Sequence, residues 1–364
     1  MWSNRTVQLI LWILGVLVLG YILWNVRSII SYFFIAAIIA FVARPTMRLL
    51  GKVKIKNWVM PNWLKAAIVL ITFVLILVGA VNLIIPTVVH QADIISKIDT
   101  DNLINKIQPQ IQAATGWMEK ANINEAEVQK SLEEEVSNLF NIGNIGSYIK
   151  GIIGGLTDSL IAVFSILFIS FFLIKDGNIV DNVVDSLTPN NYLDKIKTIF
   201  NDAKNLLSRY FIGVIIQISI VMLVITIGLT ILGVNNALLI GLIAGIFNII
   251  PYVGPLIGGA VGVSLAITSQ LEIDPTMDIL SFGLLALIPF AVAQLLDNFV
   301  LQPLIFSQSV KAHPLEIFIV ILAAGSLGGV LGMILAVPIY SFLRIVAREF
   351  FNGYKVVQGL TKNI

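Results

Sequence analysis

Long apolar stretches separated by short polar segments run along most of the chain. A helix needs about 20 apolar residues to cross the hydrocarbon core of a bilayer. Five stretches meet this length or approach it closely, namely 7–24, 66–85, 152–174, 211–233 and 279–301. A shorter one, 29–43, is followed by Arg44 and Arg48, which can snorkel to the interface and lengthen it. The pattern predicts an all-α, polytopic integral membrane protein with six to eight spans.

We expect the first apolar stretch to be an uncleaved span rather than a secretory signal. Its 18 residues exceed the apolar region of a signal peptide, which is about 7–15 residues long, and no cleavage site of the A-x-A type follows.

The apolar region 237–270 is interrupted by the segment GIFNIIPYVGPLIGG. Pro251 and Pro255 each remove a backbone donor and clash with the preceding turn of a helix. The resulting halves, ALLIGLIAGIFNII and LIGGAVGVSLAIT, are each roughly 20 Å long and too short to cross. We therefore expect a re-entrant hairpin with a Pro/Gly tip. The alternative is a kinked, full-length helix whose small residues pack against a neighbour.

A second apolar region, 315–343, repeats this pattern. The segment GSLGG at 325–329 divides it, and Pro338 predicts a further break. A kinked span is again the alternative. Broken apolar segments mark the binding sites of secondary transporters, because unwound backbone is tolerated only inside protein or along a water-filled cavity.

Composition agrees with a membrane protein and excludes several kinds of chemistry. Hydrophobic residues make up 57% of the 364 residues and charged residues only 12%, against roughly 25% charged in a soluble domain. Cysteine is absent, which excludes disulfides and thiolate sites. The chain carries no Walker A, H-E-x-x-H or G-x-S-x-G motif. We expect no enzymatic activity, no cofactor, no metal and no nucleic-acid partner.

Basic residues predict the orientation in the membrane. Segment 43–65 carries six Lys or Arg residues and no acid, so we expect it to be cytoplasmic together with both termini. Segment 88–150, with nine acids and five lysines, then lies outside as a small helical layer, and 175–209 forms a cytoplasmic connector. Lipid is an expected partner.

These features suggest four parts. They are three spans with a basic loop (1–87), the acidic external segment (88–150), a transport core (151–348) and a basic cytoplasmic tail (349–364).

One span ends in a polar stripe. Gln294, Asn298 and Gln302 recur at spacings of four, and Asp297 stands beside Asn298. An ionisable group at membrane depth suggests a functional site, so Asp297 is a candidate for binding a coupling proton or sodium ion. The alternative is an acid at a helix end, paired with Lys311 or a backbone amide.

The tip of the first broken segment supplies further candidates. Asn248 can satisfy carbonyls freed by the break, and Tyr252 can contact a solute or anchor at an interface. Gln217, alone in an apolar span, is expected to hydrogen-bond another helix rather than bind a ligand. The full set of inferred substrate- or ion-binding residues is Asn248, Pro251, Tyr252, Gly254, Pro255, Gln294, Asp297, Asn298, Gly328 and Gly329.

The order of four motifs resembles a known family. IPYVGPLIGG is followed by an Asp-Asn pair before QPLIF, then by KAHPLEIF and by GSLGGVLGMILAVP. The chain is similar to the bacterial autoinducer-2 exporter family of permeases over essentially its whole length. The motif residues are Pro251, Gly254, Pro255, Asp297, Asn298, Pro303, His313, Pro314, Gly328, Gly329 and Pro338.

The resemblance implies a homo-oligomeric inner-membrane transporter, for which a pentamer is one arrangement. It implies export of autoinducer-2, a small polyol, whereas other members resemble sodium (lithium)/proton antiporters. Three hypotheses result: export of a small polar solute coupled to protons, monovalent cation/proton antiport, and a non-transporting envelope scaffold or passive pore.

Overall fold

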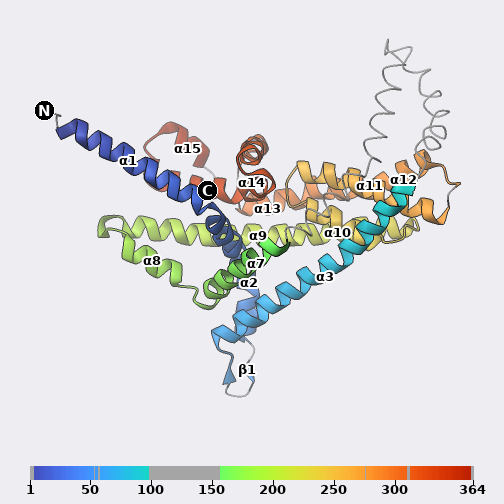
Figure 1. The fold of residues 1–364 in the computed structure, drawn as a ribbon, viewed down its shortest axis with the longest axis horizontal. Coiled ribbons are helices and arrows are strands. Elements are labelled where there is room, and N and C mark those ends of the chain that lie inside the picture. The colour runs from blue at the N-terminus through green and yellow to red at the C-terminus, as the bar shows by residue number, and fades with distance from the viewer. Residues whose placement is uncertain are drawn as a thin grey trace, which may run out of the picture. The chain divides into compact units, whose positions relative to one another are not determined.

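The fold is almost entirely helical in the residues that the structure describes. A computed structural model describes residues 4–52, 54–55, 58–97, 156–274, 276–309 and 312–361. The chain divides into two compact units, one formed by residues 1–74 and 155–197 and the other by residues 75–154 and 198–364. Figure 1 shows the order of the helices by colour. The predicted external layer lies mostly outside the described residues.

The first unit packs around three helices. Its complete helices are α1 (Asn4–Asn25), α2 (Arg27–Lys52), α7 (Leu156–Lys175), α8 (Ile179–Leu187) and the 3-10 helix η2 (Asn190–Tyr192). The two-residue strands β1 (Lys54–Ile55) and β2 (Trp58–Val59) pair antiparallel. Helix α3 (Asn62–Lys97) begins in this unit. Buried side chains of α2, α3 and α7, including Ile39, Ala66 and Ile174, form its core.

Helix α2 is longer than the apolar stretch that predicts it. It extends past Arg44, Pro45 and Arg48 to Lys52, so the basic segment begins inside the helix rather than in a loop. The remaining part of that segment forms the short strand pair.

The second unit contains the interrupted segments. Its elements are the larger part of α9 (Leu193–Ile231), followed by α10 (Ala237–Phe247), α11 (Val253–Ile273), α12 (Ile279–Leu296), the π-helix η3 (Asp297–Leu301), α13 (Gln302–Ser309), α14 (Pro314–Phe351) and α15 (Lys355–Thr361). Buried residues of α9, α10, α11 and α12, among them Leu229, Ile240 and Ala266, form one continuous apolar core.

Helices α10 and α11 form an antiparallel hairpin, as the broken apolar pattern predicts. A Cβ built on Gly258 would lie 3.3 Å from the Cα of Ala244, and one built on Gly262 would lie 3.3 Å from Cγ2 of Ile240. At the open end, Ser269 Oγ donates to the carbonyl of Asn235 over 2.9 Å. Glycines at spacings of four on α11 therefore let the two backbones approach closely.

The details of this break differ from the prediction. Only Pro251 lies in the irregular tip, which comprises residues 248–252. Pro255 is the third residue of α11, where its missing donor costs nothing because the first turn of a helix has no intrahelical acceptors. Helix α11 is 21 residues long, enough for a crossing, whereas α10 has only 11 residues. The prediction of two short halves was therefore wrong for the second half.

Helix α14 also folds back on itself. Its backbone leaves the helical region at Gly329, with φ 57° and ψ −143°. The Tyr340 hydroxyl donates to Glu316 Oε2 over 2.8 Å, although 24 residues of straight helix would separate them by about 36 Å. The predicted break in 325–329 is confirmed. The further break predicted at Pro338 was wrong, since Pro338 is buried within the second arm and Gly329 is the interruption there.

The described helices agree with a multi-pass membrane protein. By length and composition, six are long and apolar enough to cross a membrane: 27–52, 62–86, 190–231, 253–273, 279–305 and 314–351, the last counted whole although it folds back at Gly329. Large apolar side chains remain exposed on these helices, such as Leu75, Leu256 and Leu284, as expected for surfaces that face lipid.

Candidate functional site

A fully buried carboxylate lies where three elements of the second unit meet. Asp297, the first residue of the π-helix η3, has 0% of its surface exposed. Gln217 of α9 donates from Nε2 to Asp297 Oδ1 over 2.6 Å, and Gln302 of α13 donates from Nε2 to Oδ2 over 2.8 Å. Both amides are themselves buried. Each carboxylate oxygen thus accepts a hydrogen bond from a different helix.

The tip of the α10–α11 hairpin provides a third amide. Asn248 is 4% exposed, and its side chain lies near the Asp297 carboxylate. Its Nδ2 nevertheless makes no hydrogen bond in the described part of the chain. The tip and Asp297, which the sequence suggested as separate candidates, are therefore neighbours in the fold.

No counter-charge accompanies the carboxylate among the described residues. Its interactions there are with the neutral amides of Gln217, Asn248 and Gln302. Lys311, the partner considered from the sequence, lies outside the described residues. An uncompensated charge in an apolar interior is costly, so such a group tends to bind a proton or a cation.

The predicted polar stripe is connected by hydrogen bonds. Gln294 Nε2 donates to Asn298 Oδ1 over 2.9 Å, and Gln302 Nε2 donates to the same oxygen over 3.2 Å. Asn298 is exposed, whereas Gln302 and Asp297 are buried. The stripe therefore leads from an exposed surface of the helix to the buried carboxylate.

Tyr252 closes the hairpin tip in a strained conformation. Its φ of 66° and ψ of −52°, together with a 2.8 Å hydrogen bond from the Val253 amide to the Pro251 carbonyl, define a γ-turn of the rare, strained type. Its ring contacts Phe318 of α14 edge-on, with 5.9 Å between centroids. Strained backbone of this kind concentrates at functional sites.

The remaining candidates play different structural parts. Gly254 packs so tightly that a Cβ would overlap the Phe247 carbonyl oxygen. The absence of a side chain there allows the start of α11 to approach the end of α10. Gly328 and Gly329 lie at the bend of α14.

Sequence reasoning missed the importance of Gln217. It correctly suggested a hydrogen-bonding residue, but the acceptor lies 80 positions away and no periodicity reveals it. The available signal was a lone amide in an apolar span, which implies a polar partner on another helix.

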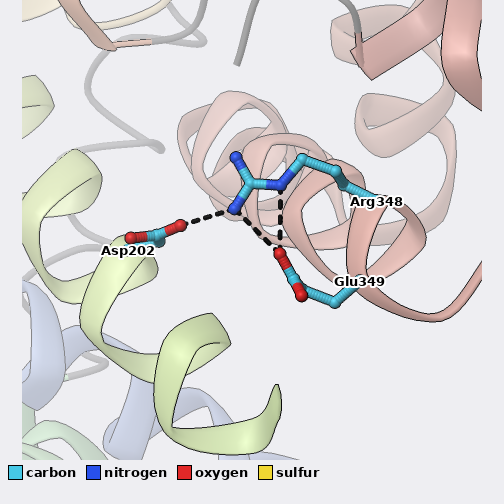
Figure 2. Close-up of polar contacts among 3 residues, drawn as sticks. All are labelled: Asp202, Arg348 and Glu349. Carbon is cyan, nitrogen blue, oxygen red and sulfur yellow. Dashed lines mark hydrogen bonds and ion pairs between the residues drawn. The ribbon is translucent and has the colours of Figure 1, made fainter. Parts of the chain in front are cut away.

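A second polar cluster joins the start of α9 to the end of α14, as Figure 2 shows. Arg348 Nη2 lies 2.5 Å from Asp202 Oδ2 and 3.2 Å from Glu349 Oε1. These side chains are partly exposed. This cluster suits a structural link between the two helices rather than a binding site.

Comparison with known proteins identifies the family of this chain. The model of the AI-2E family transporters matches residues 9–352. The chain belongs to the AI-2E family of transporters. The autoinducer-2 exporter resemblance deduced from the motifs is thereby confirmed, and the family is one of transporters rather than of known enzymes.

Three relatives match this chain over most of their length. "Putative transport protein YueF" of Bacillus subtilis (strain 168) is 30% identical over 89% of this chain and 84% of its own. "Putative transport protein MJ1177" of Methanocaldococcus jannaschii is 25% identical over 86% of each chain. "Putative permease PerM" of Escherichia coli (strain K12) is 24% identical over 94% of this chain and 93% of its own.

Proposed function

We propose that this AI-2E family transporter is a secondary transporter that exports a small polar solute, such as autoinducer-2, in exchange for a proton bound at Asp297. The observation that carries the proposal is a buried carboxylate with neutral amide partners and no counter-charge among the described residues. Gln217 stands eight residues beyond Arg209 on α9, about 12 Å along the axis. The site therefore lies inside an apolar span.

Proton binding would change the contacts of the carboxylate. While Asp297 is charged, its two oxygens accept from Gln217 and Gln302. A protonated carboxyl has a donor on one oxygen and accepts there more weakly, so the amide facing that oxygen loses part of its hydrogen bond or flips to accept the proton through its own oxygen. Because Gln217 belongs to α9 and Asn248 to the hairpin tip, protonation would bias the packing of both elements against the helix that carries Asp297.

Monovalent cation/proton antiport is the second candidate. It is favoured by the complete enclosure of Asp297, which suits a desolvated ion better than a larger solute. In both candidates Asp297 carries the exchangeable charge, and they differ in what moves against the proton.

The test is flux through the purified protein in proteoliposomes. Asp297→Asn should abolish proton movement driven by a solute or sodium gradient, because the amide cannot exchange a proton. Asp278→Asn is the matched control, since Asp278 is an exposed cap of α12. Sodium-driven proton flux in the wild type would identify the antiporter. Full proton coupling in Asp297→Asn, or no gradient-driven flux in the wild type, would refute the proposal.

We further propose that the α10–α11 hairpin is re-entrant and that both termini are cytoplasmic in the inner membrane of a homo-oligomer. Eleven residues of α10 extend about 17 Å, so a tip that follows α10 stops within the bilayer. The chain has no native cysteine, so Thr276→Cys should react with an impermeant maleimide in intact cells. Asn191→Cys is the control: it lies in the proposed cytoplasmic connector 175–209 and should not react. Labelling of Thr276→Cys only after permeabilisation would contradict the re-entrant arrangement.

A further inference from the structure

The helix that carries Asp297 is locally widened. After α12, the backbone N–H of Gln302 donates to the carbonyl of Asp297, five residues earlier, and 297–301 form a π-helix. Such turns contain one more residue than an α-helical turn and occur frequently at functional sites. The widening begins at the buried carboxylate itself.

Pro303 gives a physical reason for this turn. In a regular α-helix its ring would clash with the carbonyl of Phe299, four residues earlier, and that carbonyl would lose its donor. A wider turn relieves the clash. The Pro303 side chain is exposed, so packing in the core does not account for it and its effect falls on the backbone.

The π turn decides whether Gln302 can reach Asp297. Five residues of α-helix rotate by 500°, which places the two side chains about 140° apart. Here Gln302 Nε2 instead contacts Asp297 Oδ2 over 2.8 Å. Its other bond, to Asn298 Oδ1, joins residues four apart and is compatible with an ordinary α-helix. Only the bond to the carboxylate depends on the π turn.

We propose that Pro303 is a positioning residue of the ion site: it maintains the π turn, and the π turn holds Gln302 against Asp297. The inference rests on the proposed function, in which Asp297 exchanges a proton. The groups that face the carboxylate are Gln217 from α9, Asn248 from the hairpin tip and Gln302 from its own helix. No charged side chain of the described residues joins them, so the amides control the charge state.

The experiment measures protonation of Asp297 directly. Infrared difference spectra of the purified full-length protein, with Asp297→Asn as the background, give the titration midpoint of this carboxyl without any transport. Gln302→Met removes the donor at similar length, and Pro303→Ala removes the cause of the π turn. Pro86→Ala is the matched control, because Pro86 is an exposed proline inside α3.

Both variants should raise the titration midpoint by about one pH unit, since each removes a hydrogen bond that favours the charged form. The double variant should shift no further than Gln302→Met alone, because Pro303 acts through Gln302. Pro303→Ala should remain folded, as alanine is the better helix former, and Pro86→Ala should titrate as the wild type does.

Three results would overturn the role of Pro303 alone: a wild-type midpoint in Pro303→Ala, additive shifts in the double variant, or loss of folded Pro303→Ala protein. A wild-type carboxyl that does not titrate would instead refute the proposed function, and with it the ion site that Pro303 is proposed to position.

Discussion

The closeness of the α10–α11 hairpin can be tested at Gly254. A Cβ at this position would overlap the carbonyl oxygen of Phe247, which is backbone and cannot move aside without opening the hairpin. Overpacking of this kind costs about 1–3 kcal/mol. Gly259, on the same helix, has nothing within 4 Å of an added Cβ, so alanine there should stabilise the helix by up to about 1 kcal/mol.

The two alanine variants should therefore differ by about 1–4 kcal/mol in stability. Heating the detergent-solubilised protein and measuring the remaining monodisperse fraction should give a Gly254→Ala transition several degrees below that of Gly259→Ala. Transport should also fall in Gly254→Ala, because opening the tip moves Asn248 away from Asp297. Equal thermal stability and equal transport in the two variants would show that the close approach of the helices is wrong.

Three further predictions concern the bend of α14 at Gly329, the ion pair between Arg348 and Asp202, and the Asp297 carboxylate. Gly329→Ala should destabilise the protein by about 1–3 kcal/mol, because its positive φ is unfavourable for alanine; thermal unfolding should show no such loss in Gly328→Ala, which has open space and no positive φ, and equal losses would contradict the bend. Arg348→Ala should lower stability by no more than about 1 kcal/mol, since its pair with Asp202 is partly exposed; high salt should remove the difference, and a loss that persists in high salt would exclude an electrostatic origin. Gln217→Met should raise the midpoint of the pH dependence of transport, because the buried carboxylate loses a donor; an unchanged pH profile would remove this amide from the site.

Several of the spans and the positions of the interruptions could be predicted because both depend on local sequence, whereas the predicted spans 7–24 and 152–174 contain only shorter apolar helices. Apolar length determines whether a helix can cross, and the tip of the first hairpin contains Pro251 where the pattern placed a break. Which proline interrupts a helix and which lies within one could not be predicted. Pro255 and Pro338 look equivalent to Pro251 in sequence, yet one begins a helix and the other continues one. Position within a helical turn decides the effect of a proline, and composition does not reveal that position.

The assembly of the site depends on contacts that sequence does not encode locally. Asp297 could be singled out because an acid in an apolar span is costly. Its partners Gln217 and Asn248 come from other elements, and the hydrogen bond from Gln302 needs a π turn that helical periodicity does not predict. The chemistry of the site was therefore visible in one residue, and its geometry only in the fold.

Uphill transport in proteoliposomes tests the central role of Asp297 most directly. With an imposed pH gradient, the wild-type protein should accumulate its solute or cation against a concentration gradient, whereas Asp297→Asn should show no accumulation. Uphill accumulation that persists in Asp297→Asn would contradict the account, because the driving proton would then bind elsewhere.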